Sequence, residues 1–358
     1  SVLSVIAPWV GGPSFNEIHM ATAIYRLGVH SEDFSYRIAQ SSVFAQLLER
    51  TIEALDTCAM EVRPSSNIFW AMGRLRSSAA PFSVLRPALI RCVLQGAGEM
   101  NPQDISNIFW AAGALRLEDE EMRGMLAALC KAARREALNA KPQELANIIW
   151  AAGTLRLDGE EMESAITDLL LAAQQKASNM NPQHLANIIW GAGVLRFDSS
   201  VVSAAVATLS NEVDLKLNRF KPQELGNTCW GLALVGVRND RLMTRVADRV
   251  VQTAAAWSGK DISFNLPEVV WAAAKMDFKS KALLAHVPEV LLSLPSSLDA
   301  LTDWSLCALV WSYVKLDTDR EFADFRRSLV AKASQRGLNA QAVSRSRLGP
   351  HAWAVSKD

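Results

Sequence analysis

Side-chain amides recur along this sequence in a fixed register, with glutamines at positions 103, 143, 183 and 223. A glutamine, a neighbouring position of variable type and an asparagine return together in each copy. Because amides both donate and accept hydrogen bonds, such a series could bind base edges or sugar and phosphate oxygens, one unit per nucleotide, while the variable position adjusts the preference. The candidate RNA-binding residues are Gln103, Gln143, Gln183 and Gln223; Asp104, Glu144, His184 and Glu224; and Asn107, Asn147, Asn187 and Asn227, with Asn67 in the same register.

The same residues also have a purely structural interpretation. Amides that join neighbouring helices by side-chain hydrogen bonds must also recur in every unit. For the asparagines we favour this structural account, while keeping them among the candidate binding residues. For the glutamines and the variable position, which lie nearer the start of the expected helix, we favour binding.

Motifs for catalysis or metal binding are absent from the sequence. There is no glycine-rich phosphate loop, HExxH, paired CxxC or nucleophile elbow, and the five histidines are isolated. The acidic pairs at 120–121 and 160–161 lie where a helix would begin, and the helix dipole explains them. We therefore expect no enzyme, no cofactor, no metal and no small-molecule substrate.

Composition indicates a folded protein without a charge bias. Half of the residues are hydrophobic, and 37 basic side chains balance 37 acidic ones. Strong phosphate binding usually accompanies a basic excess, so a neutral chain is equally suited to hold other proteins together. The five cysteines are scattered and odd in number, which favours reduced thiols.

The apolar runs and the first residues of the sequence indicate where the protein is located. No apolar run approaches the roughly 18 to 20 residues that span a bilayer, and the first residues lack the basic flank of a signal peptide. The absence of an initiating methionine leads us to expect a further segment before Ser1.

A tryptophan register defines the repeats that must position these amides. The interval between successive tryptophans is constant from Trp70 to Trp230 and only slightly longer before Trp271 and Trp353. We expect a degenerate N-terminal region at 1–60, five regular repeats at 61–261, two divergent ones at 262–343 and a truncated one at 344–358. The tryptophans are Trp70, Trp110, Trp150, Trp190, Trp230, Trp271, Trp311 and Trp353.

Each repeat is expected to form two helices. Asn-Pro or Lys-Pro precedes the first helix, which is predicted from Pro142 to about Leu157 in the fourth copy, and Asp158 is expected to cap the second. One such hairpin cannot bury its own apolar face, but a stack of hairpins can. The sequence therefore predicts an all-α fold, an α-solenoid superhelix of about eight 40-residue helix-turn-helix repeats.

A helical wheel separates the faces of the first helix. Leu145, Ile148 and Ala152 fall on a buried arc, Gln143 and Asn147 on a polar stripe. Trp150 stands at the border, and we expect its indole to pack into the space beside small residues of the adjacent repeat. The arginines six positions after each tryptophan fall on the buried side of the wheel, so we interpret them as links between helices. They are Arg76, Arg116, Arg156 and Arg196.

Two local basic clusters are better candidates for phosphate contacts. One lies late in a second helix and the other near the C-terminus, and both could instead be solvated helix ends. They contain Lys131, Arg134 and Arg135, and Arg326 and Arg327, with Lys332, Arg336, Arg345 and Arg347 beyond.

The phrases "KPQELANIIWAAGTL" and "NPQHLANIIWGAGVL" resemble the Pro-Gln-x-Leu-Ala-Asn-x-x-Trp-Ala phrase of octotricopeptide repeat proteins. The resemblance is specific over residues 101–235. The family's Pro-Pro-Pro-Glu-Trp phrase and its occasional RAP domain are not present in the sequence.

The resemblance implies a nucleus-encoded protein of a mitochondrion or plastid. Members of that family bind, stabilise, process or help translate organellar transcripts, and related repeats occur in organellar ribosomes. The expected partner is therefore single-stranded or ribosomal RNA. The competing hypothesis is a protein-binding scaffold subunit of an organellar ribosome or another large complex.

Overall fold

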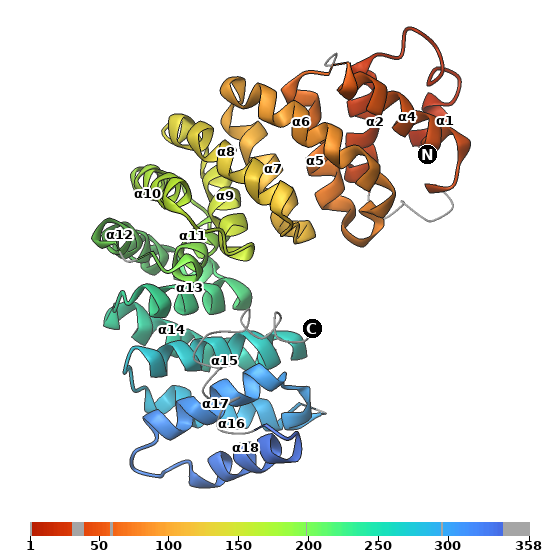
Figure 1. Cartoon of the computed structure of the whole chain (residues 1–358). Coiled ribbons are helices and arrows are strands. Elements are labelled where there is room, and N and C mark those ends of the chain that lie inside the picture. The colour runs from red at the N-terminus through yellow and green to blue at the C-terminus, as the bar shows by residue number, and fades with distance from the viewer. Residues whose placement is uncertain (1, 31–38, 58–59, 198, 295, 339–358) are drawn as a thin grey trace. The chain divides into compact units, whose positions relative to one another are not determined.

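The computed structural model describes residues 2–30, 39–57, 60–197, 199–294 and 296–338. These residues divide into two compact units, residues 1–176 and 177–358, which are taken separately below. Every regular element in the described ranges is a helix (Figure 1). None of these helices is both long and apolar enough to cross a bilayer.

The first unit is a stack of helical hairpins in two layers. The first helices of successive hairpins pack side by side, and so do the second helices (Figure 1). A short helix, α1 (Val2–Ile6), precedes the stack. The first helices are α2 (Glu17–Val29), α5 (Val62–Leu75), α7 (Pro102–Leu115) and α9 (Pro142–Thr154), and the second are α4 (Ser42–Asp56), α6 (Arg86–Gly96), α8 (Glu120–Glu136) and α10 (Glu160–Gln175); η2 (Arg76–Leu85) and η3 (Ala97–Glu99) are 3-10 turns.

The second unit repeats this arrangement with four more hairpins. Together the described residues form eight hairpins, so the predicted all-α solenoid of about eight repeats is confirmed. The first helices are α11 (Pro182–Leu195), α13 (Pro222–Val235), α15 (Gly259–Lys275) and α17 (Asp303–Leu316), the second are α12 (Ser200–Lys216), α14 (Asp240–Thr253), α16 (Lys281–Leu292) and α18 (Ala323–Gln335), and the 3-10 turns are η4 (Ala177–Asn179), η5 (Leu217–Arg219), η6 (Ala254–Ala256) and η7 (Ser297–Ala300).

The predicted helix starts are found in the four repeats that carry Asn-Pro or Lys-Pro, at α7, α9, α11 and α13. Asn101 and Asn181 are N-caps whose side chains accept hydrogen bonds from the third backbone N–H of their helices, with proline in the first turn. Asp158 does not cap α10, because the cap is Gly159 with φ +99°. One repeat earlier, the position equivalent to Gly159 is Asp119, and its carboxylate caps α8.

The first helices end earlier than predicted. The α9 helix stops at Thr154 rather than near Leu157, and Arg156 has a left-handed φ of 47°. A wheel extended past the last helical residue therefore placed Arg156 wrongly in the buried arc, whereas its side chain is exposed. Arg76 and Arg116 are also exposed and left-handed, and neither they nor Arg156 forms an ion pair with another described residue.

Small residues and tryptophans pack neighbouring first helices together, as expected. A Cβ on Gly73 would lie 2.8 Å from Trp110 Cζ3 of the next hairpin, and one on Gly113 would lie 3.0 Å from Trp150 Cζ3. Glycine at these places lets the indole reach the backbone of the adjacent helix. The predicted packing of the indole beside small residues is therefore confirmed in the first unit.

Cations near the ends of several second helices hold their hairpins to the loop before them. In the first unit, Lys176 Nζ donates to Leu138 O and Ala140 O, both at 2.6 Å. In the second, Lys216 Nζ donates to Ser178 O at 2.7 Å and Met180 O at 2.9 Å. Hydrogen bonds from a charged donor satisfy loop carbonyls that would otherwise lack a protein partner.

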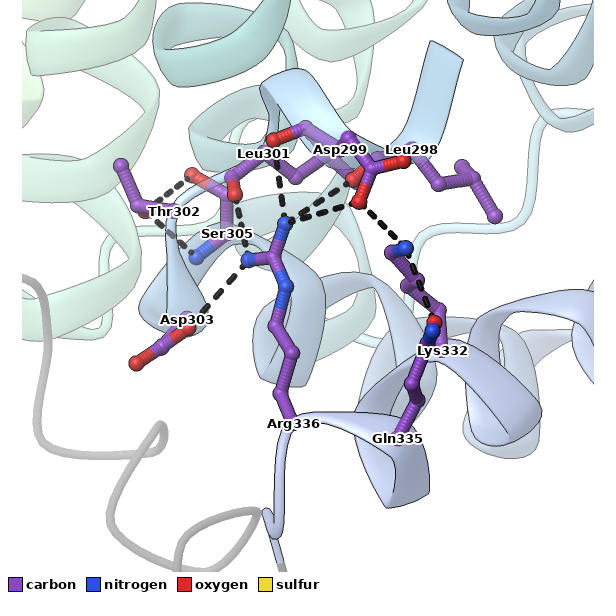
Figure 2. A network of polar contacts seen from close by, with 9 residues as sticks. All are labelled: Leu298, Asp299, Leu301, Thr302, Asp303, Ser305, Lys332, Gln335 and Arg336. Atoms are coloured by element: carbon purple, nitrogen blue, oxygen red, sulfur yellow. Dashed lines mark hydrogen bonds and ion pairs between the residues drawn. The ribbon is translucent and has the colours of Figure 1, made fainter. Parts of the chain in front are cut away.

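The last of these carbonyl-binding cations is Arg336. Its guanidinium donates to Leu301 O at 2.6 Å and Asp299 O at 3.0 Å. Figure 2 shows these contacts beside an ion pair between Lys332 and Asp299. Arg336 therefore serves a structural role and is not a free phosphate ligand among the described residues.

Cys92, Cys130, Cys229 and Cys307 are free and buried. Burial raises the pKa of the Cys229 thiol to about 12, so it remains protonated. Cys58, Arg345, Arg347, Trp353 and the expected partial repeat at 344–358 lie outside the described residues.

Candidate nucleic-acid interface

The glutamines occupy the second position of four first helices and are exposed. In the first unit these are Gln103 and Gln143, and in the second Gln183 and Gln223. Within the described ranges, none of the four side chains makes a hydrogen bond to another residue. Their amides are therefore open to a partner at the start of each helix.

The asparagines lie one turn further along and are half-buried. The expected hydrogen-bonded bridges between helices are not formed: the amides of Asn67, Asn107 and Asn147 have no partner in the described part of the first unit. The same holds for Asn187 and Asn227 among the described residues of the second. Because their atoms are not sealed from solvent, these amides keep donors and acceptors available.

The variable position performs a structural task that sequence reasoning missed. Glu144 Oε2 accepts from Lys141 N at 2.7 Å, and Glu224 Oε2 accepts from Lys221 N at the same distance. His184 Nδ1 accepts from Asn181 N at 3.4 Å, and desolvation lowers the pKa of the imidazole, which favours its neutral, accepting form. Each of these side chains caps the start of its own helix, so a carboxylate and an imidazole both serve at this position.

Asp104 is the most constrained member of this set. Its side chain is only 5% exposed, its Oδ1 accepts from Ser66 Oγ of α5 at 2.7 Å, and its Oδ2 accepts from Asn101 N at 3.4 Å. The carboxylate thus joins α7 to α5 as well as capping α7. The variable position is a weaker candidate for base selection than the glutamines and asparagines beside it.

Aromatic rings form a column along the first helices within each unit. Tyr25 stacks on Trp70 at 4.8 Å between centroids, and Trp70 lies 6.4 Å from Trp110. In the second unit Trp230 stacks on Trp271 at 4.0 Å, and both are buried. The rings pack on one another, so the structural interpretation of the tryptophans holds for these contacts.

The predicted phosphate contacts are mostly engaged elsewhere. Arg134 forms a 2.9 Å ion pair with Asp168, and Arg135 donates to Met100 O at 2.9 Å. Arg327 pairs with Asp324. Lys131 and Arg326 have no ion pair with a described residue, and of the two only Lys131 is exposed.

The cations that bind loop carbonyls could have been predicted from their spacing in the sequence. Arg135, Lys176 and Lys216 follow one another at nearly the repeat length, and each binds carbonyls of the preceding loop. A basic residue that recurs near the end of successive second helices marks this contact with the loop, which local clustering of charge alone does not reveal.

One family comparison bears on this surface. Residues 99–208 match the family model described as Tbc2 translation factor, N-terminal domain. The matched segment includes Gln103, Gln143 and Gln183 with their neighbouring asparagines, whereas Gln223 lies beyond it. No curated protein matches the chain.

Proposed function

We propose that the chain binds RNA of a mitochondrion or plastid along the amide-bearing face of its first helices. The RNA is a transcript or a ribosomal RNA, and binding supports its stability, processing, translation or assembly into a ribosome. The proposal assigns the chain no catalytic step and no cofactor.

The observation that carries the proposal is the set of unpaired amides in a segment similar to a translation factor domain. The glutamines are exposed and the asparagines half-buried, and neither set has a hydrogen-bond partner among the described residues. Residues 99–208 match a translation factor family. The octotricopeptide resemblance adds the organelle and the kind of RNA.

Regular spacing supports a modular mode of contact. An amide pair that returns in two successive repeats of each unit presents the same donors and acceptors to successive nucleotides within that unit. The tryptophans pack the helices behind this surface, and the capping side chains fix where each helix begins. These contacts fix the helix backbones that carry the amides, so the helices need not reorganise when RNA binds.

Crosslinking by ultraviolet light in purified organelles, followed by sequencing of attached RNA, tests the function directly. We expect RNA above background with the wild-type chain. Recovery of a stable protein complex without RNA would instead establish the scaffold hypothesis.

A matched set of variants tests the surface. Replacing Gln143, Gln183 and Gln223 together by alanine should weaken RNA binding at least about tenfold, given roughly 0.5 to 1.5 kcal/mol for each lost hydrogen bond. The control replaces Gln175 and Gln252, exposed glutamines of second helices, by alanine. Equal affinities of the two sets would place the binding surface elsewhere.

A further inference from the structure

A groove of about 490 Å³ lies in the first unit between three successive first helices. The α2, α5 and α7 helices line it, and they lie side by side in Figure 1. It contains Asn67 and Gln103, one asparagine and one glutamine of the unpaired amides. Its volume is in the range of small-ligand sites and accommodates a single planar base.

One wall of the groove is apolar. Ile18 is 60% exposed on α2, and the half-buried ring of Tyr25 follows it at the spacing that places both on one face of that helix. Pro64 of α5 lies across from them. The Tyr25 ring is held by its stack on Trp70, so this wall is rigid enough to pack against the face of a base.

Hydrogen-bond acceptors dominate the other wall. Glu61 is exposed, stands at the N-cap of α5 and makes no capping hydrogen bond with its side chain. Asp104 adds a second carboxylate, fixed by the hydrogen bond from Ser66. An ionised carboxylate only accepts hydrogen bonds, while the amides of Asn67 and Gln103 do both.

Among the described residues that line the groove, one carries a guanidinium. Arg63 of α5 is exposed and forms no ion pair or side-chain hydrogen bond with another described residue. With the two carboxylates the lining carries more negative than positive charge. It therefore suits a ligand part rich in N–H donors, with the phosphate near Arg63.

We infer that this groove holds a nucleobase that carries an exocyclic amine, namely adenine, cytosine or guanine, and disfavours uracil. The inference rests on the proposed RNA binding and adds a preference to it. An exocyclic amine donates to Glu61 or to the amide oxygens of Asn67 and Gln103. Uracil has no exocyclic amine, and the one N–H of its pairing edge lies between two carbonyl oxygens that would face the carboxylates. The phosphate of that nucleotide pairs with Arg63.

The test measures fluorescence anisotropy of the full chain with short labelled homopolymers of A, C and U. We expect the chain to bind the U homopolymer at least about fivefold more weakly than the A and C homopolymers. This factor is the lower end of the range for one discriminating contact. Glu61→Gln should reduce this difference, because a side-chain amide can turn its N–H toward a uracil carbonyl. The matched control is Glu53→Gln, an exposed glutamate of α4 that is not among the groove residues.

Two further variants separate binding from preference. Asn67→Ala should weaken binding of A and C by about fivefold and of U by less, and Arg63→Ala should weaken all three alike. Equal affinities for A, C and U, or an unchanged preference in Glu61→Gln, would overturn the inference and leave the proposed function intact. Failure of the chain to bind any RNA would overturn the proposed function itself.

Discussion

The indole of Trp110 lies against Gly73 of the preceding hairpin, so that a Cβ at Gly73 would meet both Trp110 Cζ3 and the Cα of Ala111 at 2.8 Å. One of these atoms belongs to backbone, which cannot turn aside. The contact shows how the tryptophan register and the small residues near it operate as one unit. The glycine of one repeat makes room for the aromatic ring of the next.

Gly73→Ala should therefore destabilise the chain by about 1 to 3 kcal/mol, because the added methyl overpacks the contact between α5 and α7. Urea unfolding followed by circular dichroism measures the effect. Gly124→Ala is the control, since Gly124 is exposed in α8 and has open space at its Cβ position. It should stabilise by about 0.5 to 1 kcal/mol. Equal effects of the two changes would contradict the packing described.

Arg116→Gly should raise stability by about 1 kcal/mol, because a left-handed conformation costs a residue with a Cβ more than it costs glycine. Arg116 has φ 51° and ψ 50°. The repeat that begins with α13 already has Gly236 in the same place, at φ 82° with open space around it. The reverse change, Gly236→Arg, should lower the melting temperature. If Arg116→Gly lowers it as well, the arginine side chain has a stabilising contact of its own.

Glu268 should make the stability of the second unit depend on pH. The side chain is 1% exposed, Oε2 has no hydrogen-bond partner in the described structure, and desolvation raises the pKa to about 8. From about pH 4.5 to about pH 8 the unfolded chain has released this proton and the folded chain retains it. The free energy of unfolding therefore decreases progressively as the pH rises through this window.

Glu268→Gln should flatten this dependence, since an amide stays neutral throughout. Urea midpoints of wild type and variant at several pH values in the window provide the measurement. Glu53→Gln, at an exposed position of the first unit, controls for the loss of a carboxylate. A dependence that persists in Glu268→Gln would assign it to another group.

Lys176→Met should destabilise the first unit by about 1.5 to 3 kcal/mol, the range for hydrogen bonds from a charged group. The ammonium donates two 2.6 Å hydrogen bonds to loop carbonyls, and methionine keeps the aliphatic stem while removing them. Lys131→Met removes an exposed ammonium that has no ion pair with a described residue, and it should change stability little. Chemical unfolding of both variants beside wild type distinguishes a carbonyl-binding cation from a solvated one.

Much of the fold could be predicted from the sequence because one period fixes many positions at once. The tryptophan register located the hairpins, and the Asn-Pro pairs located the starts of α7 and α11. The ends of the first helices could not be placed in this way. A left-handed residue after a helix is usually glycine, and arginine at this place gives no such signal.

The candidate site could be predicted only in part, since a helical wheel assigns faces and not partners. It placed Gln143 and Asn147 on an accessible stripe, as found. It could not show that Glu144 turns back to its own helix start, because capping depends on the backbone beside it. The contribution of Glu61 and Tyr25 to one groove was also hidden, since α2 and α5 belong to different repeats.

The cations that bind loop carbonyls act only between consecutive hairpins. Lys176 donates to the loop at Leu138 and Ala140, and Lys216 donates to the loop at 177–180 while pairing with Glu212 of its own helix. A duplicated hairpin would therefore bring its own cation and its own acceptor loop. By this rule a gene could gain or lose a repeat in one step, and the length of the proposed RNA-binding surface would change with it.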